Sequence, residues 1–275
     1  MGLSFGILML QDVILKKSLL ATDFEVTILI FLTSSAFIFS IYGTEIINRS
    51  SDPARTIVVM AWLSRIFLFI IPLFESPAFF VFCIAAMSYL DSLIKPYWNA
   101  VFKHNYPESR RSTLYSYASS LYTIIVLVVT TFLGYLLDIN YKLYKILFPV
   151  AGLFDVLSYM SLAKMGRMGQ SLKLYHTGSV RGGISVRLLK DIAVVPVINM
   201  LKIFRSNRPF FRLEAYFFLY GMAFMIASPA VPIYLVEDLG LTYSPISIAK
   251  GLVFYTATIL FTPVMGRLHG SGNPT

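Results

Sequence analysis

Among the ionisable residues inside long apolar stretches of this sequence, five are candidates for chemistry, because a charged side chain there is costly and indicates a function or a specific partner. They are Asp12, Arg65, Asp91, Lys95 and Asp155. Asp91 and Lys95 are four residues apart, which on a helix puts both side chains on one face, where they can pair. Arg65 lies in the middle of its stretch, so we predict that it pairs with a carboxylate, Asp91 first of all.

Two interpretations of these residues stay open at this point. In the functional one, they form a polar path near the membrane midplane, and Asp12, Asp91 or Asp155 carries a proton or pairs with the substrate. A buried carboxylate with a raised pKa can load and release a proton near neutral pH. In the structural one, an interhelical ion pair such as Arg65 with Asp91 only fixes helix packing. Lys250 lies near the outer end of the last apolar stretch, where it can extend to the interface, and we assign it a structural role.

Signals for other chemistry are missing from the sequence. The three histidines, His104, His176 and His269, are widely separated, and there is no HExxH, Gly-rich phosphate loop or G-x-S-x-G motif. The single cysteine, Cys83, excludes a disulfide framework and a Cys-based metal site. We therefore expect a protein that is not an enzyme and uses no cofactor and no metal.

The composition indicates that membrane-spanning helices position these residues. Of the 275 residues, 57% are hydrophobic and 13% are charged, whereas a soluble domain carries about 25% charged residues. Several apolar runs reach the roughly 20 residues that a bilayer-spanning helix needs, and a transmembrane barrel would instead show short alternating segments. The predicted fold class is an all-α polytopic membrane protein. Its net charge of +9 fits loops facing anionic lipid, so the expected partner is the bilayer and not nucleic acid.

The apolar runs predict eight membrane spans. These are 3–20, 26–47, 56–74, 77–101, 113–137, 143–163, 213–236 and 246–265. The first is short, and we interpret it as the outer part of a helix whose beginning is missing. Pro149, Pro229 and Pro232 either break helices around a cavity or only bend them. Close helix packing is expected at three glycines, namely Gly134, Gly152 and Gly221.

A polar, basic segment at 164–212 divides the spans into a first unit, 1–163, and a second unit, 213–275. The segment holds ten of the 23 Lys and Arg residues. Because Lys and Arg are retained on the inner side, we expect it to be cytoplasmic and the protein to be a multi-pass protein of the cytoplasmic membrane. Within it, 184–203 mixes apolar and basic residues, which suits a helix on the membrane surface or a linker helix packed on the bundle.

Two stretches of the sequence echo each other. Residues 22–28 (TDFEVTI) enter the second span and residues 242–248 (TYSPISI) enter the eighth. Both would begin the second helix of a unit at the outer side. Two parallel units joined by a long inner loop are typical of one large class of transporters.

The chain resembles the major facilitator superfamily in several segments. These are 207–212 (NRPFFR), 229–236 (PAVPIYLV), 239–244 (LGLTYS) and 107–111 (PESRR). The family's signature between spans two and three, a glycine followed by an acid and basic residues, is met only in part, because Ile47 and Asn48 occupy the acidic and first basic positions. Matching the signature and the loop after span four gives the gating-loop candidates Gly43, Arg49, Arg55, Arg110, Arg111, Gly266 and Arg267.

The resemblance implies a major-facilitator-like helical bundle with a six-span first unit and an incomplete second unit. It implies a secondary transporter, or a fragment of one, that moves a small solute across the cytoplasmic membrane by alternating access, coupled to an ion such as the proton. Family members usually have twelve spans, so we expect a truncated chain that associates with another copy or with a missing second half. The alternative is a non-transporting remnant or a membrane scaffold or assembly subunit. The substrate is not specified by the sequence.

Overall fold

The computed structural model describes residues 1–168, 186–253 and 255–261. Seven helical segments of this part are long and apolar enough to cross a membrane, and they correspond to predicted spans two to eight. They are Asp23–Ile47, Pro53–Leu73, Pro77–Lys103, Tyr117–Ile139, Tyr141–Arg167, Arg208–Glu237 and Tyr243–Phe261. The predicted all-α polytopic fold class is confirmed.

The helices of the first unit are α1 (Gly2–Leu8), α2 (Gln11–Ser18), α3 (Asp23–Ser35), α4 (Ser40–Arg49), α5 (Pro53–Ile70), α6 (Pro77–Ser92), α7 (Lys95–Asn105), α8 (Glu108–Ile139) and α9 (Tyr144–Met168). Short 3-10 turns accompany them at η1 (Ala36–Phe39), η2 (Ile71–Leu73) and η3 (Tyr141–Leu143). After them come α10 (Val186–Ser206), α11 (Arg208–Ala227), α12 (Ala230–Glu237), α13 (Tyr243–Ser247) and the π-helical turn η5 (Ile248–Val253).

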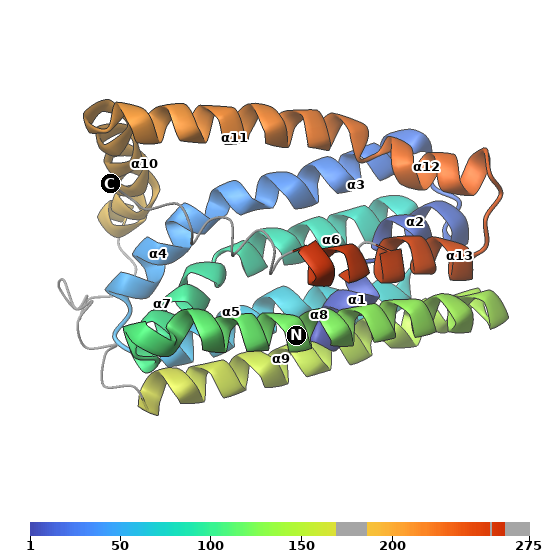
Figure 1. Cartoon of the computed structure of the whole chain (residues 1–275), viewed down its shortest axis with the longest axis horizontal. Coiled ribbons are helices and arrows are strands. Elements are labelled where there is room, and N and C mark those ends of the chain that lie inside the picture. Colours follow the sequence, from blue (N-terminus) through green and yellow to red (C-terminus); the bar gives the residue numbers. More distant parts are fainter. Residues whose placement is uncertain (169–185, 254, 262–275) are drawn as a thin grey trace.

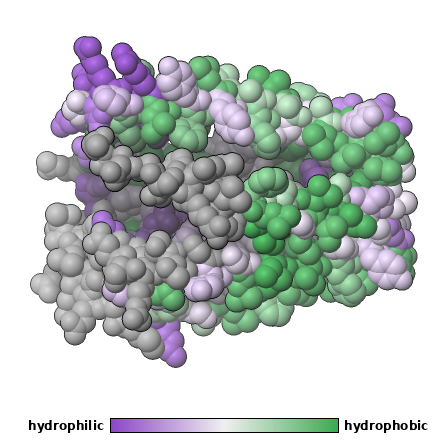
Figure 2. All heavy atoms as spheres, in the orientation of Figure 1, coloured by the Kyte–Doolittle hydropathy of each residue, from purple (hydrophilic) through white to green (hydrophobic). Residues whose placement is uncertain are grey.

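The long helices run side by side as an antiparallel bundle (Figure 1). The turns predicted to be outer lie together at the right end of the view, and those predicted to be inner lie at the left end, so the predicted alternation of the spans is present. Hydrophobic surface covers the middle of the visible face, and hydrophilic surface gathers toward the two ends (Figure 2). Such a band is what a bilayer-spanning bundle presents to lipid.

The predicted first span is a pair of short helices. α1 and α2 are separated at Met9 and Leu10, directly before the polar residues Gln11 and Asp12. Neither helix is long enough to be counted among the candidate spans. The pair is nevertheless central to the bundle, because Leu10, Val13, Ile14 and Leu15 are fully buried in the main apolar core.

Proline acts differently at each place where it occurs in a span. The predicted continuous helix at 77–101 is interrupted between α6 and α7, and Pro96 is the second residue of α7. The seventh span is interrupted at Pro229, between α11 and α12, whereas Pro149 stays inside α9 and Pro232 inside α12. The break before Pro96 arises because proline has no N–H to donate to the Ser92 carbonyl and its ring would clash with that carbonyl in a continuous helix. The sequence analysis did not single out this break.

The two sequence echoes correspond to two equivalent helix starts. Thr22 is the N-cap of α3, where its hydroxyl accepts from the Glu25 amide and Glu25 in turn accepts from the Thr22 amide, at 3.3 and 2.9 Å. Thr242 is the N-cap of α13, but the position equivalent to Glu25 is Pro245, which cannot complete this capping box. The free backbone N–H groups at the start of α13 therefore need a hydrogen-bond acceptor from elsewhere in the chain.

Two of the three predicted packing glycines lie at close helix contacts. A Cβ atom at Gly134 of α8 would collide with the side chain of Ser247 and the backbone of Tyr243, and one at Gly152 would reach Phe69 at 3.2 Å. The prediction for Gly221 is wrong for the part of the chain that the structure describes, because none of it lies within 4 Å of a Cβ atom at that position. The difference arises because α11 is exposed along most of its length, whereas α8 packs against both α13 and η5.

α10 runs across the predicted inner end of α11 (Figure 1). It packs against α4 and α11. Its opposite face exposes Val194, Ile198 and Leu201, so the segment is amphipathic in the way expected of a helix at a membrane surface.

We predict that Gly134→Ala lowers the melting temperature of the detergent-solubilised protein, because overpacking costs about 1–3 kcal/mol. The matched control is Gly221→Ala, where the added methyl group enters open space and better helix propensity stabilises by up to about 1 kcal/mol. Equal melting temperatures for the two variants would show that α8 and α13 do not pack at Gly134.

Candidate functional site

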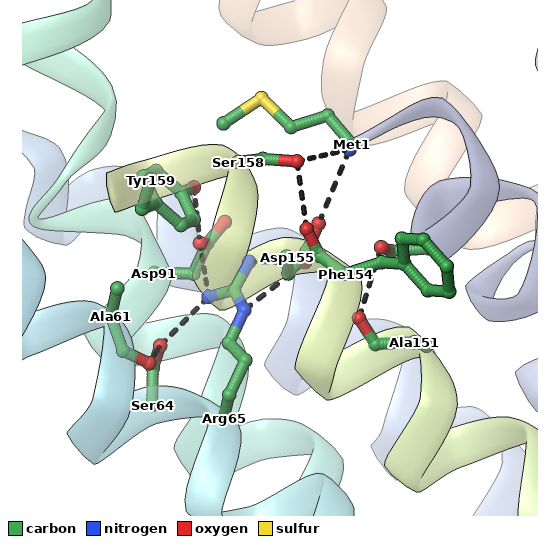
Figure 3. Close-up of polar contacts among 11 residues, drawn as sticks. Met1, Ala61, Ser64, Arg65, Asp91, Ala151, Phe154, Asp155, Ser158 and Tyr159 are labelled. Carbon is green, nitrogen blue, oxygen red and sulfur yellow. Dashed lines mark hydrogen bonds and ion pairs between the residues drawn. The ribbon is translucent and has the colours of Figure 1, made fainter. Parts of the chain in front are cut away.

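Arg65 of α5 is the centre of a buried polar cluster that joins three helices (Figure 3). Its side chain is only 4% exposed. Nη2 and Nε donate to Asp155 Oδ2 of α9 at 2.7 and 3.1 Å, and Nη1 forms an ion pair with Asp91 of α6. The predicted pair of Arg65 with Asp91 is confirmed, and Asp155 is a second partner.

Neighbouring side chains complete the hydrogen bonding of this cluster. The Tyr159 hydroxyl donates to Asp91 Oδ1 at 2.8 Å, and its ring centroid lies 5.0 Å from the guanidinium carbon of Arg65. Arg65 Nη1 also donates to Ser64 Oγ at 2.7 Å. The Met1 amino group donates to Ser158 Oγ at 2.8 Å and lies 3.8 Å from Asp155. Burying a guanidinium is tolerable only with partners of this number and geometry.

All the helices that supply this cluster belong to the first unit. α5 packs against both α6 and α9, so the ion pairs cross short distances between neighbours that share one core. A movement of the second unit relative to the first would leave them unchanged. This geometry suits the structural interpretation of the Arg65–Asp91 pair.

A second ion pair, between Asp12 and Lys250, crosses from the first unit to the second. Lys250 Nζ donates to both carboxylate oxygens of Asp12, at 2.7 and 2.5 Å, and lies 3.5 Å from the Met9 carbonyl oxygen. The two side chains are 14% and 17% exposed. Each comes from irregular helix: Asp12 follows the break between α1 and α2, and Lys250 lies in the π-helical turn η5.

The prediction that Lys250 extends to the membrane interface is wrong. Its ammonium group turns inward to Asp12, because a carboxylate within reach in a poorly hydrated environment is a stronger partner than distant water. The sequence analysis missed this pair because the two residues are 238 positions apart.

Further polar contacts between the units lie at the predicted outer end. Lys16 forms an ion pair with Glu237, and Lys17 donates to the Leu241 carbonyl oxygen at 2.6 Å. Ser18 and Tyr243 share a hydrogen bond between their hydroxyl groups. At this end, α2 packs against α12 and α8 packs against α13.

Asp138, at the end of α8, supplies the missing cap of α13. Its carboxylate accepts from the amides of Tyr243 and Ser244 at 2.6 and 2.9 Å, and from the Ser244 hydroxyl at 2.5 Å. The sequence analysis placed Asp138 in a loop. The available signal was the echo itself, since its second copy has proline where the first has the capping Glu25.

Lys95 does not pair with Asp91, contrary to the prediction. The two residues lie on opposite sides of the break between α6 and α7, so the spacing of four no longer places them on one helix face. Lys95 Nζ lies instead 3.6 Å from the centroid of the Phe37 ring. Within the part of the chain that the structure describes, Lys95 has no ion pair.

The gating-loop candidates whose contacts the structure describes have separate partners. Gly43 lies inside α4, where a Cβ atom would collide with the backbone of Leu93. Arg49 ends α4 and donates through Nε to Glu45 at 2.5 Å. Arg55 is exposed in the first turn of α5, and its amide donates to the Asp52 carboxylate. The same carboxylate also accepts a hydrogen bond from Arg167 of α9 at 3.1 Å.

The remaining gating-loop candidates fall largely outside the described residues. Arg110 and Arg111 belong to the first turn of α8, and their side chains are not among those described; Gly266 and Arg267 lie outside the described residues altogether. Across the described ranges, no three His, Cys, Asp or Glu side chains are grouped so that they could hold a metal ion.

The sequence model of the Major Facilitator Superfamily matches residues 1–273 of this chain. The chain therefore belongs to that superfamily. Membership makes it an integral, multi-pass membrane protein of a transporter family, and not of an enzyme family. Comparisons with curated proteins and with solved structures found no match.

We predict that Arg65→Gln destabilises the protein by about 3–5 kcal/mol, because two carboxylates lose their buried counter-ion. Adding Asp155→Asn should recover part of this loss by removing one uncompensated charge. Thermal unfolding in detergent measures both effects. The control is the exposed Arg55→Gln in the same helix, which should change stability by less than about 0.5 kcal/mol. If Arg65→Gln left the thermal stability unchanged, the ion pairs of Arg65 would not stabilise the protein.

Proposed function

We propose that the chain works as a secondary transporter, which moves a small solute by alternating access of its first and second units and couples that movement to a proton. The observation that carries the proposal is the Asp12–Lys250 ion pair, because it joins the two units. An alternating-access cycle must break such a contact in each turnover, whereas ion pairs inside one unit can persist.

Irregular helices on both sides of the pair support the same role. The break between α1 and α2 leaves the Met9 carbonyl facing Lys250, and the π-helical turn presents Lys250 itself. Discontinuous helices and π-turns are frequent at transport and ion sites, since they free backbone groups for a ligand. The buried hydroxyl of Thr131 lies beside Gly251 of the same turn and has no hydrogen-bond partner among the described residues.

The coupling step follows from charge. With Asp12 ionised, the pair is neutral and holds the units together. When Asp12 takes up a proton, Lys250 loses its counter-ion, and hydration of its ammonium group becomes favourable, which drives the units apart at this end. The other charged groups on α2 and on α3 and α12, which pack against it, are Lys16, Lys17, Asp23, Glu25 and Glu237.

The Asp138 cap and the lysine contacts at the predicted outer end would belong to the same closed state. They hold α13 against α8 and α12 against α2. We place this closed end on the outside and the 164–212 segment in the cytoplasm, because that segment holds ten of the chain's 23 Lys and Arg residues.

The function itself is tested by solute uptake. Proteoliposomes are given an imposed proton gradient and a mixture of small metabolites, and internal solutes are measured by mass spectrometry. We expect at least one solute to accumulate above the level in protein-free vesicles and to be lost when an ionophore collapses the gradient. If uptake did not depend on the gradient, the proposed coupling to a proton would be wrong.

We predict the orientation from labelling of single cysteines in a Cys83→Ala background, since Cys83 is buried. Ser171→Cys should react with an impermeant reagent only from the cytoplasmic side, and Ser244→Cys only from the outside. Reaction of both sites in intact cells would reverse or abolish the assigned topology.

We predict that breaking the pair opens the end that carries Asp138. Spin labels at the exposed residues Ile139 and Leu239 report the distance between the units. Asp12→Asn should move this distance distribution to longer values, with the open population raised about 5- to 150-fold. The charge swap Asp12→Lys with Lys250→Asp should restore the closed state.

The control for this measurement is Asp155→Asn, whose ion pair lies inside the first unit. It should leave the distance between the labels unchanged. If Asp155→Asn opened the end and Asp12→Asn did not, the coupling role would pass to the Arg65 cluster.

A further inference from the structure

Lys95 is a cation in the apolar Pro77–Lys103 span, and among the described residues it has no ion pair. A lysine inside a membrane helix is costly unless its charge is neutralised or hydrated. Its ammonium group lies over the face of the Phe37 ring, 3.6 Å from the ring centroid, and a cation–π contact at an exposed site is a weak interaction. The ring alone does not offset the cost, so the ammonium group needs water or an anion as well.

The nearest carboxylate is already engaged. Asp91 accepts from both Arg65 and Tyr159, and these bonds hold it toward the interior of the first unit. Because Lys95 lies beyond the break between α6 and α7, its ammonium group forms no ion pair with Asp91, and its side chain is exposed. Within the described ranges, no carboxylate lies within ion-pair distance of this ammonium group.

The helices next to Lys95 pack closely. Gly43 of α4 packs directly against the backbone of Leu93, which brings the second span onto the helix break. Phe37 and Lys95 thus face each other from two spans that are fixed in place. Hydrophilic surface is visible between the upper and lower parts of the bundle (Figure 2).

We infer that Lys95 binds the negatively charged group of the transported solute, so that the solute is a small anion with a carboxylate or a phosphate group. The inference rests on the proposed transport function and adds its substrate class. Phe37 covers one side of the ammonium group, and its remaining N–H donors face the space where the solute group sits. α7 begins at Lys95, which adds the positive end of a helix to the same place.

The test is binding by the purified full-length chain, measured as a shift in melting temperature. The probes are matched pairs of an anion and its neutral analogue: succinate with succinamide, benzoate with benzamide, and glycerol 3-phosphate with glycerol, at constant ionic strength. We expect at least one anion to stabilise the protein while its neutral partner does not. Lys95→Gln should weaken that binding roughly ten- to a hundredfold, the scale of a lost charge-assisted hydrogen bond, and Lys95→Arg should retain most of it.

Control variants separate this role from a structural one. Lys202→Gln, at an exposed lysine of α10, should bind the anion as the wild type does. Phe37→Leu keeps the charge and should weaken binding less than Lys95→Gln, which keeps the inference testable if the latter folds poorly. Equal shifts from neutral and anionic members, no shift from any anion, or unchanged anion binding by Lys95→Gln would each overturn it.

Failure of this inference differs from failure of the coupling role. Asp12→Asn should still bind the anion, because Asp12 pairs with Lys250 and not with Lys95. Anion binding without any response of the spin-label distance would leave Lys95 as the anion-binding residue and contradict alternating access. A normal response of the spin-label distance without a preference for anions would support alternating access and contradict the role of Lys95.

Discussion

A charge inside a membrane must be neutralised where it stands, and much of this structure is arranged around that constraint. Arg65 is placed among two carboxylates, a tyrosine hydroxyl and a serine, all within the first unit. Because no water is at hand to replace a lost partner, this cluster ties α5, α6 and α9 into one body. In the proposed transport cycle, the second unit would move relative to this rigid body.

The same constraint has a different consequence at Asp12 and Lys250. Here the two halves of a neutral pair come from different units, so neutrality depends on the units being in contact. The first pair of charges stabilises a body, and the second stabilises one relative position of two bodies. Lys95 is the third case, a charge that neither arrangement neutralises.

Helix breaks make these arrangements possible. The interruptions between α1 and α2, between α6 and α7, and at the π-helical turn each lie next to one of the charged residues discussed. A straight helix would have placed Lys95 on the same face as Asp91 and would have kept the Met9 carbonyl in its own helix. Irregular backbone is tolerated inside a membrane only where protein or a hydrated cavity surrounds it, which fits the position of all three breaks near contacts between spans.

The sequence by itself determined the positions of spans two to eight and their alternation, because bilayer thickness sets the length of an apolar run. It did not reveal that the predicted first span is a pair of short helices. It also determined that Arg65 must have a carboxylate partner, since an unpaired guanidinium in the middle of an apolar span is costly. Which partners meet was decided only by tertiary structure. Asp12 and Lys250 are 238 residues apart, and the cap of α13 comes from Asp138 on another helix. Long-range pairing depends on how helices rotate and break, and apolar periodicity carries no information about either.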